Sequence, residues 1–440
     1  MAERNSPLIL GTEPIGKLLI QYSVPAIIAM TVTSLYNIID SIFIGHGVGA
    51  LAIAGLAITF PLMNLVVAFC TLVGIGGATI SSIFLGQKDK VRATEVVHNV
   101  LIMCIINAVC FGGLTFLFLD SILLFFGASH DTLPYARDFM QVILLGTPIT
   151  YVFIGLNNVM RATGYPRKAM FSSLLTVGCN IILAPIFIFS FDWGIRGAAL
   201  ATVVSQTVAM VWVLVHFANK KNFIHFDRRY SRLKVRVVAK IFSIGMSPFL
   251  MNVCACVVVI FINNALQHTG GDLAIGAYGI VNRTLMLFVM IVMGITQGMQ
   301  PIVGYNYGAK QYDRVRKTLR YGITAGVVVT TVGFVLSELF PHAIVAMFTT
   351  SEELVDLSVT GLRISCAMFP FVGCQIVISN FFQSIGRAPV SIFLSLSRQL
   401  LFLLPLLLIL PTYWSTNGVW LSMPISDFIA FVIACLLYTS

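Results

Sequence analysis

The sequence contains little charge and lacks the motifs that mark soluble enzymes. Only 10% of its 440 residues are Asp, Glu, Lys or Arg and 58% are hydrophobic, a balance too apolar for a water-soluble domain of this length. The nine Cys include no CxxC pair and the seven His no HExxH cluster, so the usual redox and metal-hydrolase patterns are absent. No Walker lysine motif is present either. We therefore predict a non-enzymatic integral membrane protein that carries no cofactor.

Long apolar runs recur along the chain between short polar breaks. Each can cross a hydrocarbon core, which needs about 20 helical residues. Prolines such as Pro148 and Pro370 lie inside the runs and predict kinks. We predict an all-α fold of twelve transmembrane helices at residues 16–44, 51–84, 94–119, 134–160, 167–191, 195–218, 237–266, 273–303, 318–341, 354–383, 388–411 and 416–438.

Most of the 27 Lys and Arg residues fall on one side of these predicted helices. Because basic residues are retained on the cytoplasmic side, we place both termini in the cytoplasm. The net charge of +10 then reflects topology, and no nucleic-acid partner is expected. We interpret the basic residues 219–236 as a cytoplasmic linker, and contact with anionic lipid is the alternative interpretation.

The chain contains two copies of one pattern, about 222 residues apart. Lys17 and Pro25 in KLLIQYSVP correspond to Lys240 and Pro248 in KIFSIGMSP. The copies define an amino-terminal lobe at 1–218 and a carboxy-terminal lobe at 237–440. Six helices per copy is an even number, so the two repeats are parallel. A substrate site between such repeats is typical of alternating-access transporters.

The copies differ at one position that bears on function. Asp40 in the first copy corresponds to Asn263 in the second. A carboxylate inside a membrane helix is costly unless it is paired, protonated or bound to a cation. Asp40 follows Tyr36 by one helical turn, so both side chains lie on one helix face. With oxygen-bearing residues of other helices it could hold Na⁺ or take up H⁺, and the alternative is a solvated carboxylate near the outer helix end.

Further polar residues lie within the predicted helices of the first copy. They are Asn157, Asn158, Asn180, Thr202 and Gln206, and the last two are one turn apart. Their amide and hydroxyl oxygens are ligands suited to a hard cation. We regard them as candidates for an ion or substrate pathway.

In the second copy, one helix face carries a methionine stripe. Its members, spaced alternately by three and four residues, are Arg283, Met286, Met290, Met293, Gln297 and Gln300. Thioethers repack around different shapes, which suits a pocket for varied organic molecules. The alternative is an interhelical seam in which Arg283 bonds to neighbouring carbonyls.

Asp427 is the main acidic candidate of the second copy. It lies inside the last predicted helix, after Pro424. It could contact a cationic substrate, take up a proton, or form a structural ion pair with Arg283 or Arg398.

Several stretches, taken in order, resemble the multidrug and toxic compound extrusion (MATE) family, in particular its bacterial DinF-like and MepA-like branch. The clearest is Gln297-Gly-Met-Gln-Pro-Ile-Val-Gly-Tyr-Asn-Tyr-Gly308, and Asn180-Ile-Ile-Leu-Ala-Pro185 supports it. The resemblance implies a V-shaped pair of six-helix bundles. It also implies export of small, often cationic and amphipathic organic compounds in exchange for Na⁺ or H⁺, by a monomer in the bacterial plasma membrane.

By this resemblance, the coupling site comprises Asp40 with Tyr36, Asn180, Thr202 and the asparagines at 157 and 158. Asp40, Asn180 and Thr202 would hold the ion if it is Na⁺. The family often has Asp just before the proline of the fifth helix, where this chain has Ala184. We therefore expect ion coupling in the first copy to depend mainly on Asp40. A flippase for a lipid-linked precursor is the alternative function, although it would need several cations in its cavity.

Overall fold

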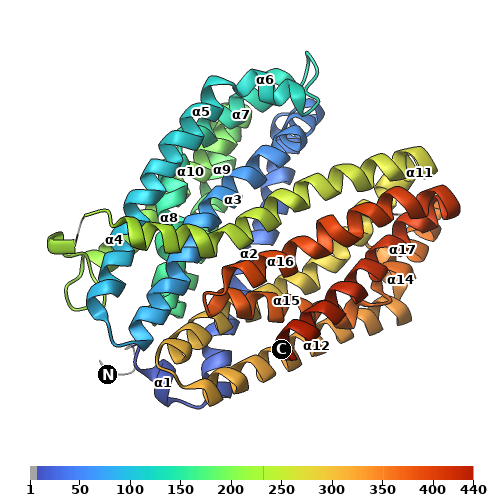
Figure 1. Ribbon diagram of the computed structural model, residues 1–440. Coiled ribbons are helices and arrows are strands. Elements are labelled where there is room, and N and C mark those ends of the chain that lie inside the picture. Colours follow the sequence, from blue (N-terminus) through green and yellow to red (C-terminus); the bar gives the residue numbers. More distant parts are fainter. Residues whose placement is uncertain (1–6, 231, 350, 440) are drawn as a thin grey trace. The chain divides into compact units, whose positions relative to one another are not determined.

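The computed structural model describes the chain except residues 1–6, 231, 350 and 440, together with the side chains of a few residues within helices. The described residues form helices joined by turns, with no strand among them (Figure 1). Both chain ends, which we predict to be cytoplasmic, include residues outside this description. The all-helical prediction is confirmed.

The helices of the first copy follow the predicted order. They are α1 Ile9–Thr12, α2 Ile15–Gly47, α3 Ala50–Gly86, α4 Lys90–Asn107, η2 Ala108–Gly112, α5 Gly113–Leu117, α6 Leu119–Phe125, α7 Leu133–Leu145, α8 Thr147–Ala162, α9 Pro166–Pro185, η3 Ile186–Ser190 and α10 Gly194–Ala218. The short helix η4, Arg228–Tyr230, lies in the linker.

The second copy is built from longer continuous helices. They are α11 Val235–Gly308, α12 Tyr312–Leu339, α13 Pro341–Ala346, α14 Glu352–Cys366, α15 Phe369–Ser384, α16 Ala388–Leu396, η5 Ser397–Leu403 and α17 Leu404–Thr439. Gly271 interrupts α11 with a φ of 64°, and Ser415 interrupts α17 with a φ of 48°. Each of these long helices therefore contains a break between two predicted spans.

Two predicted spans are bent rather than straight. The helices α7 and α8 meet at 56°, and α14 and α15 meet at 53°. Pro148 and Pro370 lie in the first turn of α8 and α15, where a missing backbone N–H costs nothing within the helix. The two prolines correspond in the repeat, so the kink predicted from each is confirmed and recurs in both copies.

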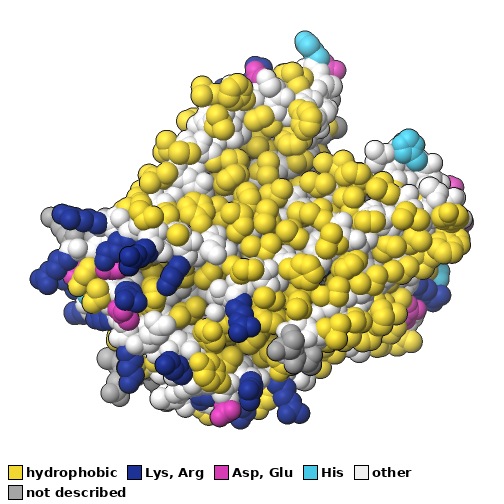
Figure 2. All heavy atoms as spheres, viewed as in Figure 1, with side chains coloured by type: hydrophobic (Ala, Val, Ile, Leu, Met, Phe, Trp, Pro, Cys, Tyr) yellow, Lys and Arg dark blue, Asp and Glu magenta, His cyan; other side chains and the backbone are white. Residues whose placement is uncertain are grey.

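The described residues contain nine helices that are long and apolar enough to cross a membrane, or eleven if each bent pair counts as one span. The last candidate, Ala388–Tyr438, has 51 residues, more than twice the length that a bilayer requires. The break at Ser415 falls between the last two of the twelve predicted spans. On the face shown in Figure 2, hydrophobic side chains cover the flanks of the helices.

The backbone repeats the sequence duplication at the helix ends. Lys88 and Lys310, which correspond, have φ values of 60° and 59°, a conformation that is uncommon for residues other than glycine. Gly164 and Gly386, which also correspond, have φ values of 105° and 79°. The two copies therefore share turns as well as helix order.

The described residues form two compact units that are not simply the two copies. Unit 1 contains residues up to Glu13, Ile28–Phe249 and Gly304–Gln311, and unit 2 contains Pro14–Ile27, Leu250–Val303 and the residues from Tyr312 onward. The first part of α2 thus belongs to unit 2, and the first part of α11 belongs to unit 1. The opening helical segment of each copy therefore belongs to the unit that is formed mainly by the other copy, and we call these the exchanged opening segments.

Close helix crossings fix the exchanged segments in each unit. In unit 1, a Cβ on Gly245 of α11 would lie 1.7 Å from the carbonyl oxygen of Leu72 in α3. In unit 2, a Cβ on Gly298 would lie 2.5 Å from the backbone nitrogen of Ser23 in α2. Only glycine permits these approaches, because any side chain would overlap the facing backbone.

Candidate functional site

Three polar side chains of unit 1 meet between α2, α9 and α10. The Asn180 amide donates to the Tyr36 hydroxyl at 3.0 Å and to Thr202 Oγ1 at 3.0 Å. The Tyr36 and Thr202 oxygens are also 3.0 Å apart. Thr202 donates its own hydrogen to the carbonyl of Ala198, so Tyr36 is the donor in the Tyr36–Thr202 bond. Each of the three helices contributes one member to this polar group.

Asp40 lies one turn beyond Tyr36 on α2. Its side chain is buried, and within the described part of the chain its Oδ1 has no hydrogen-bond partner. A buried carboxylate oxygen without a partner carries a desolvation cost that a proton or a bound cation would remove. The burial of this side chain argues against the alternative of a solvated carboxylate at the outer end of the helix.

The polar group continues along α10 by one turn. Thr150 of α8 donates a short hydrogen bond to Gln206, which follows Thr202 by four residues. The structure thus brings Gln206, predicted for the substrate pathway, to the polar face that carries Thr202. Thr150 was missed in the sequence, because a lone Thr in an apolar helix gives no signal of its partner.

Asn157 and Asn158 do not join this group. Asn157 donates to Ser172 Oγ at 2.6 Å and to the carbonyl of Ala169, which joins α8 to α9. Asn158 donates to Ile154 and accepts from Arg161. Ser172 precedes Asn180 by eight residues on α9, or about 12 Å of helix rise. The expected placement of these asparagines beside Asp40 therefore does not match the structure.

The methionine stripe is open rather than packed over part of its length. Arg283 is exposed, Met286 is 46% exposed, and Met290, Met293 and Gln297 are half-buried. No ion pair involving Arg283 is found among the described residues. The stripe is therefore not a closed seam at the end that carries Arg283 and Met286, whereas Gln300 at the other end is buried.

Asp427 forms an ion pair with Arg398. The distance from Asp427 Oδ1 to Arg398 Nε is 2.6 Å, and the Asp427 side chain is only 8% exposed. Of the partners predicted for Asp427, the structure selects Arg398. This pairing explains how the carboxylate is accommodated inside α17.

Ala184, the departure from the family pattern, lies in an apolar core. It is fully buried in a cluster that includes Ile44, Phe139 and Ala201. No group of three or more His, Cys, Asp or Glu side chains that could hold a metal is present among the described residues. Asp40 is thus not accompanied by a second acidic side chain at position 184.

The duplicated helical architecture and the buried intramembrane carboxylate define a class, the helical membrane transporters built from parallel repeats. Residues 25–186 and 244–409 match the MatE family, with one block in each copy. The chain belongs to this family, as the sequence resemblance predicted, and its members are transporters rather than enzymes.

Known relatives cover nearly the whole chain. The multidrug export protein MepA of Staphylococcus haemolyticus (strain JCSC1435) is 29% identical over 430 residues, which is 97% of this chain and 94% of that protein. The MepA protein of Staphylococcus aureus (strain MSSA476) is 26% identical over 428 residues, covering 96% and 93%. These matches agree with the predicted branch of the family.

Solved structures share the fold. The structure of the MATE multidrug transporter DinF-BH is 36% identical, with a TM-score of 0.90 and coverage of 98% of this chain and 96% of that one. A MATE crystal structure in the bent conformation gives a TM-score of 0.93 at 23% identity, covering 98% and 96%, and shows the fold alone. The predicted MATE fold is therefore confirmed.

Proposed function

We propose that this protein is an antiporter of the bacterial plasma membrane that exports varied, often cationic and amphipathic organic compounds in exchange for Na⁺ or H⁺. Membership of the MatE family supports transport, and the names of MepA and DinF-BH support multidrug export. The observation that carries the coupling step is the buried Oδ1 of Asp40, which has no hydrogen-bond partner among the residues that the structure describes.

The coupling site consists of Asp40 with Tyr36, Asn180 and Thr202. A proton would neutralise the carboxylate directly. Na⁺ would instead require several oxygen ligands. Asp40 and the side-chain carbonyl of Asn180 would supply two, and Thr202 would supply a third once a hydrogen bond that its hydroxyl oxygen accepts is released. Either ion changes the charge on α2, which packs against α9 and α10 through the Tyr36 hydrogen bonds. Loading and release of the ion would thereby bias the packing of α2.

The substrate face is the open part of the methionine stripe. Flexible thioethers at Met286, Met290 and Met293 can adapt to aromatic compounds of different outline. Gln297 adds a hydrogen-bonding group to this face, and Arg283 acts as a gating cation. In unit 1, Gln206 lies on the polar face of α10 and is proposed separately as part of the substrate pathway. Asp427 has a supporting role through its pair with Arg398.

The flippase alternative receives less support. A pyrophosphate-linked lipid would need several free cations along the pathway. Arg398 is paired with Asp427, which leaves Arg283 as the remaining candidate cation of the proposed pathway. Export of organic compounds agrees better with this arrangement.

The test uses purified protein in proteoliposomes with a fluorescent cationic dye. A Na⁺ gradient and a pH gradient are imposed separately, and the gradient that drives dye movement identifies the coupling ion. We expect Asp40→Asn to abolish gradient-driven transport, because the amide can neither take up a proton nor neutralise Na⁺. Asp120→Asn is the matched control, since Asp120 is exposed and paired with Arg137. Transport by Asp40→Asn at the rate of the control would overturn the coupling proposal.

A further inference from the structure

A cavity in unit 1 gathers basic side chains that the transport site does not use. Its volume is about 530 Å³. It lies where the linker enters α11, beside the start of α4. Its lining residues are Phe84, Arg92, Glu95, Lys234, Val235, Arg236, Val237 and Lys240. Lys and Arg side chains gather in this region of the molecule in Figure 2.

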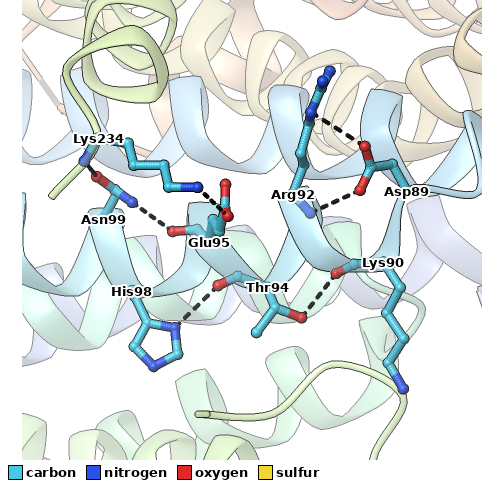
Figure 3. A network of polar contacts seen from close by, with 8 residues as sticks. All are labelled: Asp89, Lys90, Arg92, Thr94, Glu95, His98, Asn99 and Lys234. Carbon is cyan, nitrogen blue, oxygen red and sulfur yellow. Dashed lines mark hydrogen bonds and ion pairs between the residues drawn. The ribbon is translucent and has the colours of Figure 1, made fainter. Parts of the chain in front are cut away.

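One lining cation is held in place by α4, as Figure 3 shows. Lys234 Nζ forms a short ion pair with the buried carboxylate of Glu95. The backbone N–H of Lys234 donates to Asn99 Oδ1 at 2.9 Å, and the Asn99 amide donates to the carbonyl of Glu95 at 2.7 Å. These bonds fix the residue just before α11, and with it the direction in which α11 begins.

The remaining cations exceed the acidic groups available. Arg92 pairs with Asp89 at 3.2 Å. In the part of the chain that the structure describes, Arg236 and Lys240 have no ion-pair partner. Glu95 is already engaged by Lys234. The cavity therefore carries a net positive charge, because Glu95 and Asp89 balance only two of its four cations.

Aromatic contacts and helix geometry also favour an anion in this cavity. The Arg92 and Lys240 head groups lie 5.8 Å and 5.6 Å from the centre of the buried Phe84 ring, so one side chain orients two cations. The helix α11 begins at Val235 without a side-chain cap. The positive end of its dipole thus lies at the cavity, where it favours an anion.

We propose that this cavity binds a phosphate group, carried either by an anionic phospholipid headgroup or by a soluble phosphate. Its volume falls within the range of pockets that hold small ligands, about 300 to 1,000 Å³. A phosphate here would receive charge-assisted hydrogen bonds from Arg236 and Lys240. It would also bridge α4 and the start of α11, so that binding stabilises the junction between the linker and the second copy.

The test measures ligand affinity and thermal unfolding of the purified full-length protein in detergent. Inorganic phosphate is titrated in one arm, and phosphatidylglycerol in mixed micelles in the other, with phosphatidylcholine as the neutral lipid. The cavity variant is Arg236→Gln/Lys240→Gln. The control, Lys220→Gln/Lys221→Gln, removes the same charge from exposed linker positions outside the cavity.

We expect phosphatidylglycerol, inorganic phosphate or both to raise the unfolding temperature of the wild type and of the control equally. The ligand that acts identifies the source of the phosphate. The cavity variant should bind that ligand about tenfold more weakly or worse, because it loses two charge-assisted contacts. If the double variant does not fold, Lys240→Gln alone takes its place, since this exposed side chain should tolerate substitution. An equal loss in the control, or no response to either ligand, would overturn the proposal.

Discussion

The ion pair of Asp427 and Arg398 allows a quantitative prediction for unit 2. The two charged atoms are 2.6 Å apart, and the side chains are 8% and 31% exposed. Removing one partner of a buried pair costs about 3 to 5 kcal/mol, because the other charge remains desolvated. Since Arg398 keeps some exposure, we expect the lower end of this range, about 3 kcal/mol, for Asp427→Leu.

The double variant Arg398→Leu/Asp427→Leu should be far less destabilised. It leaves no buried charge, so we expect its free energy of unfolding to return to within about 1 kcal/mol of the wild type. Chemical unfolding in detergent micelles measures the double variant and the two single variants, Asp427→Leu and Arg398→Leu. Breaking the exposed pair of Arg137 and Asp120 with Arg137→Leu is the control, with an expected cost below about 1 kcal/mol. Losses that simply add in the double variant would refute this reasoning.

Three further predictions concern helix packing and the substrate face. Gly245→Ala should destabilise unit 1 by about 1 to 3 kcal/mol in chemical unfolding, because its Cβ would meet the Leu72 carbonyl. Gly178→Ala, with open space around it, should instead be neutral or stabilising, and equal effects would contradict the packing argument. Ala184→Asp should lower the yield of folded protein, measured by size-exclusion chromatography, because it places a carboxylate in an apolar core. An undiminished yield would mean that this core accommodates a charge. Met286→Ala should narrow the range of compounds transported in the proteoliposome assay, and an unchanged range would assign the stripe to packing.

The spans and the duplication could be predicted because both rest on patterns within the chain. Apolar length predicts a membrane helix, and Pro148 and Pro370 each predict a kink. The exchange of opening segments could not be predicted. It depends on which helix faces Gly245 across space, and a small residue in an apolar run gives no sign of its partner.

Part of the candidate site could also be predicted from patterns within the chain. Tyr36 and Asp40 share a helix face by simple periodicity, and the resemblance supplied Asn180 and Thr202. Asn157 and Asn158 were predicted to lie beside Asp40, but in the structure they bond to other residues. Residue type alone does not indicate how far along a bent helix a side chain lies from a site on a neighbouring helix. Arg398 was one of two partners that charge alone offered for Asp427, and only the helix geometry selects between them.

The exchanged opening segments have a consequence for how this chain can be divided. A cut in the linker at 219–236 would produce two fragments, and neither would contain a complete compact unit. The first fragment would lack Val235–Phe249 and Gly304–Gln311, and the second would lack Pro14–Ile27. Although the gene product reads as two tandem copies, its halves are interdependent, and we expect them to be stable only when they are produced together.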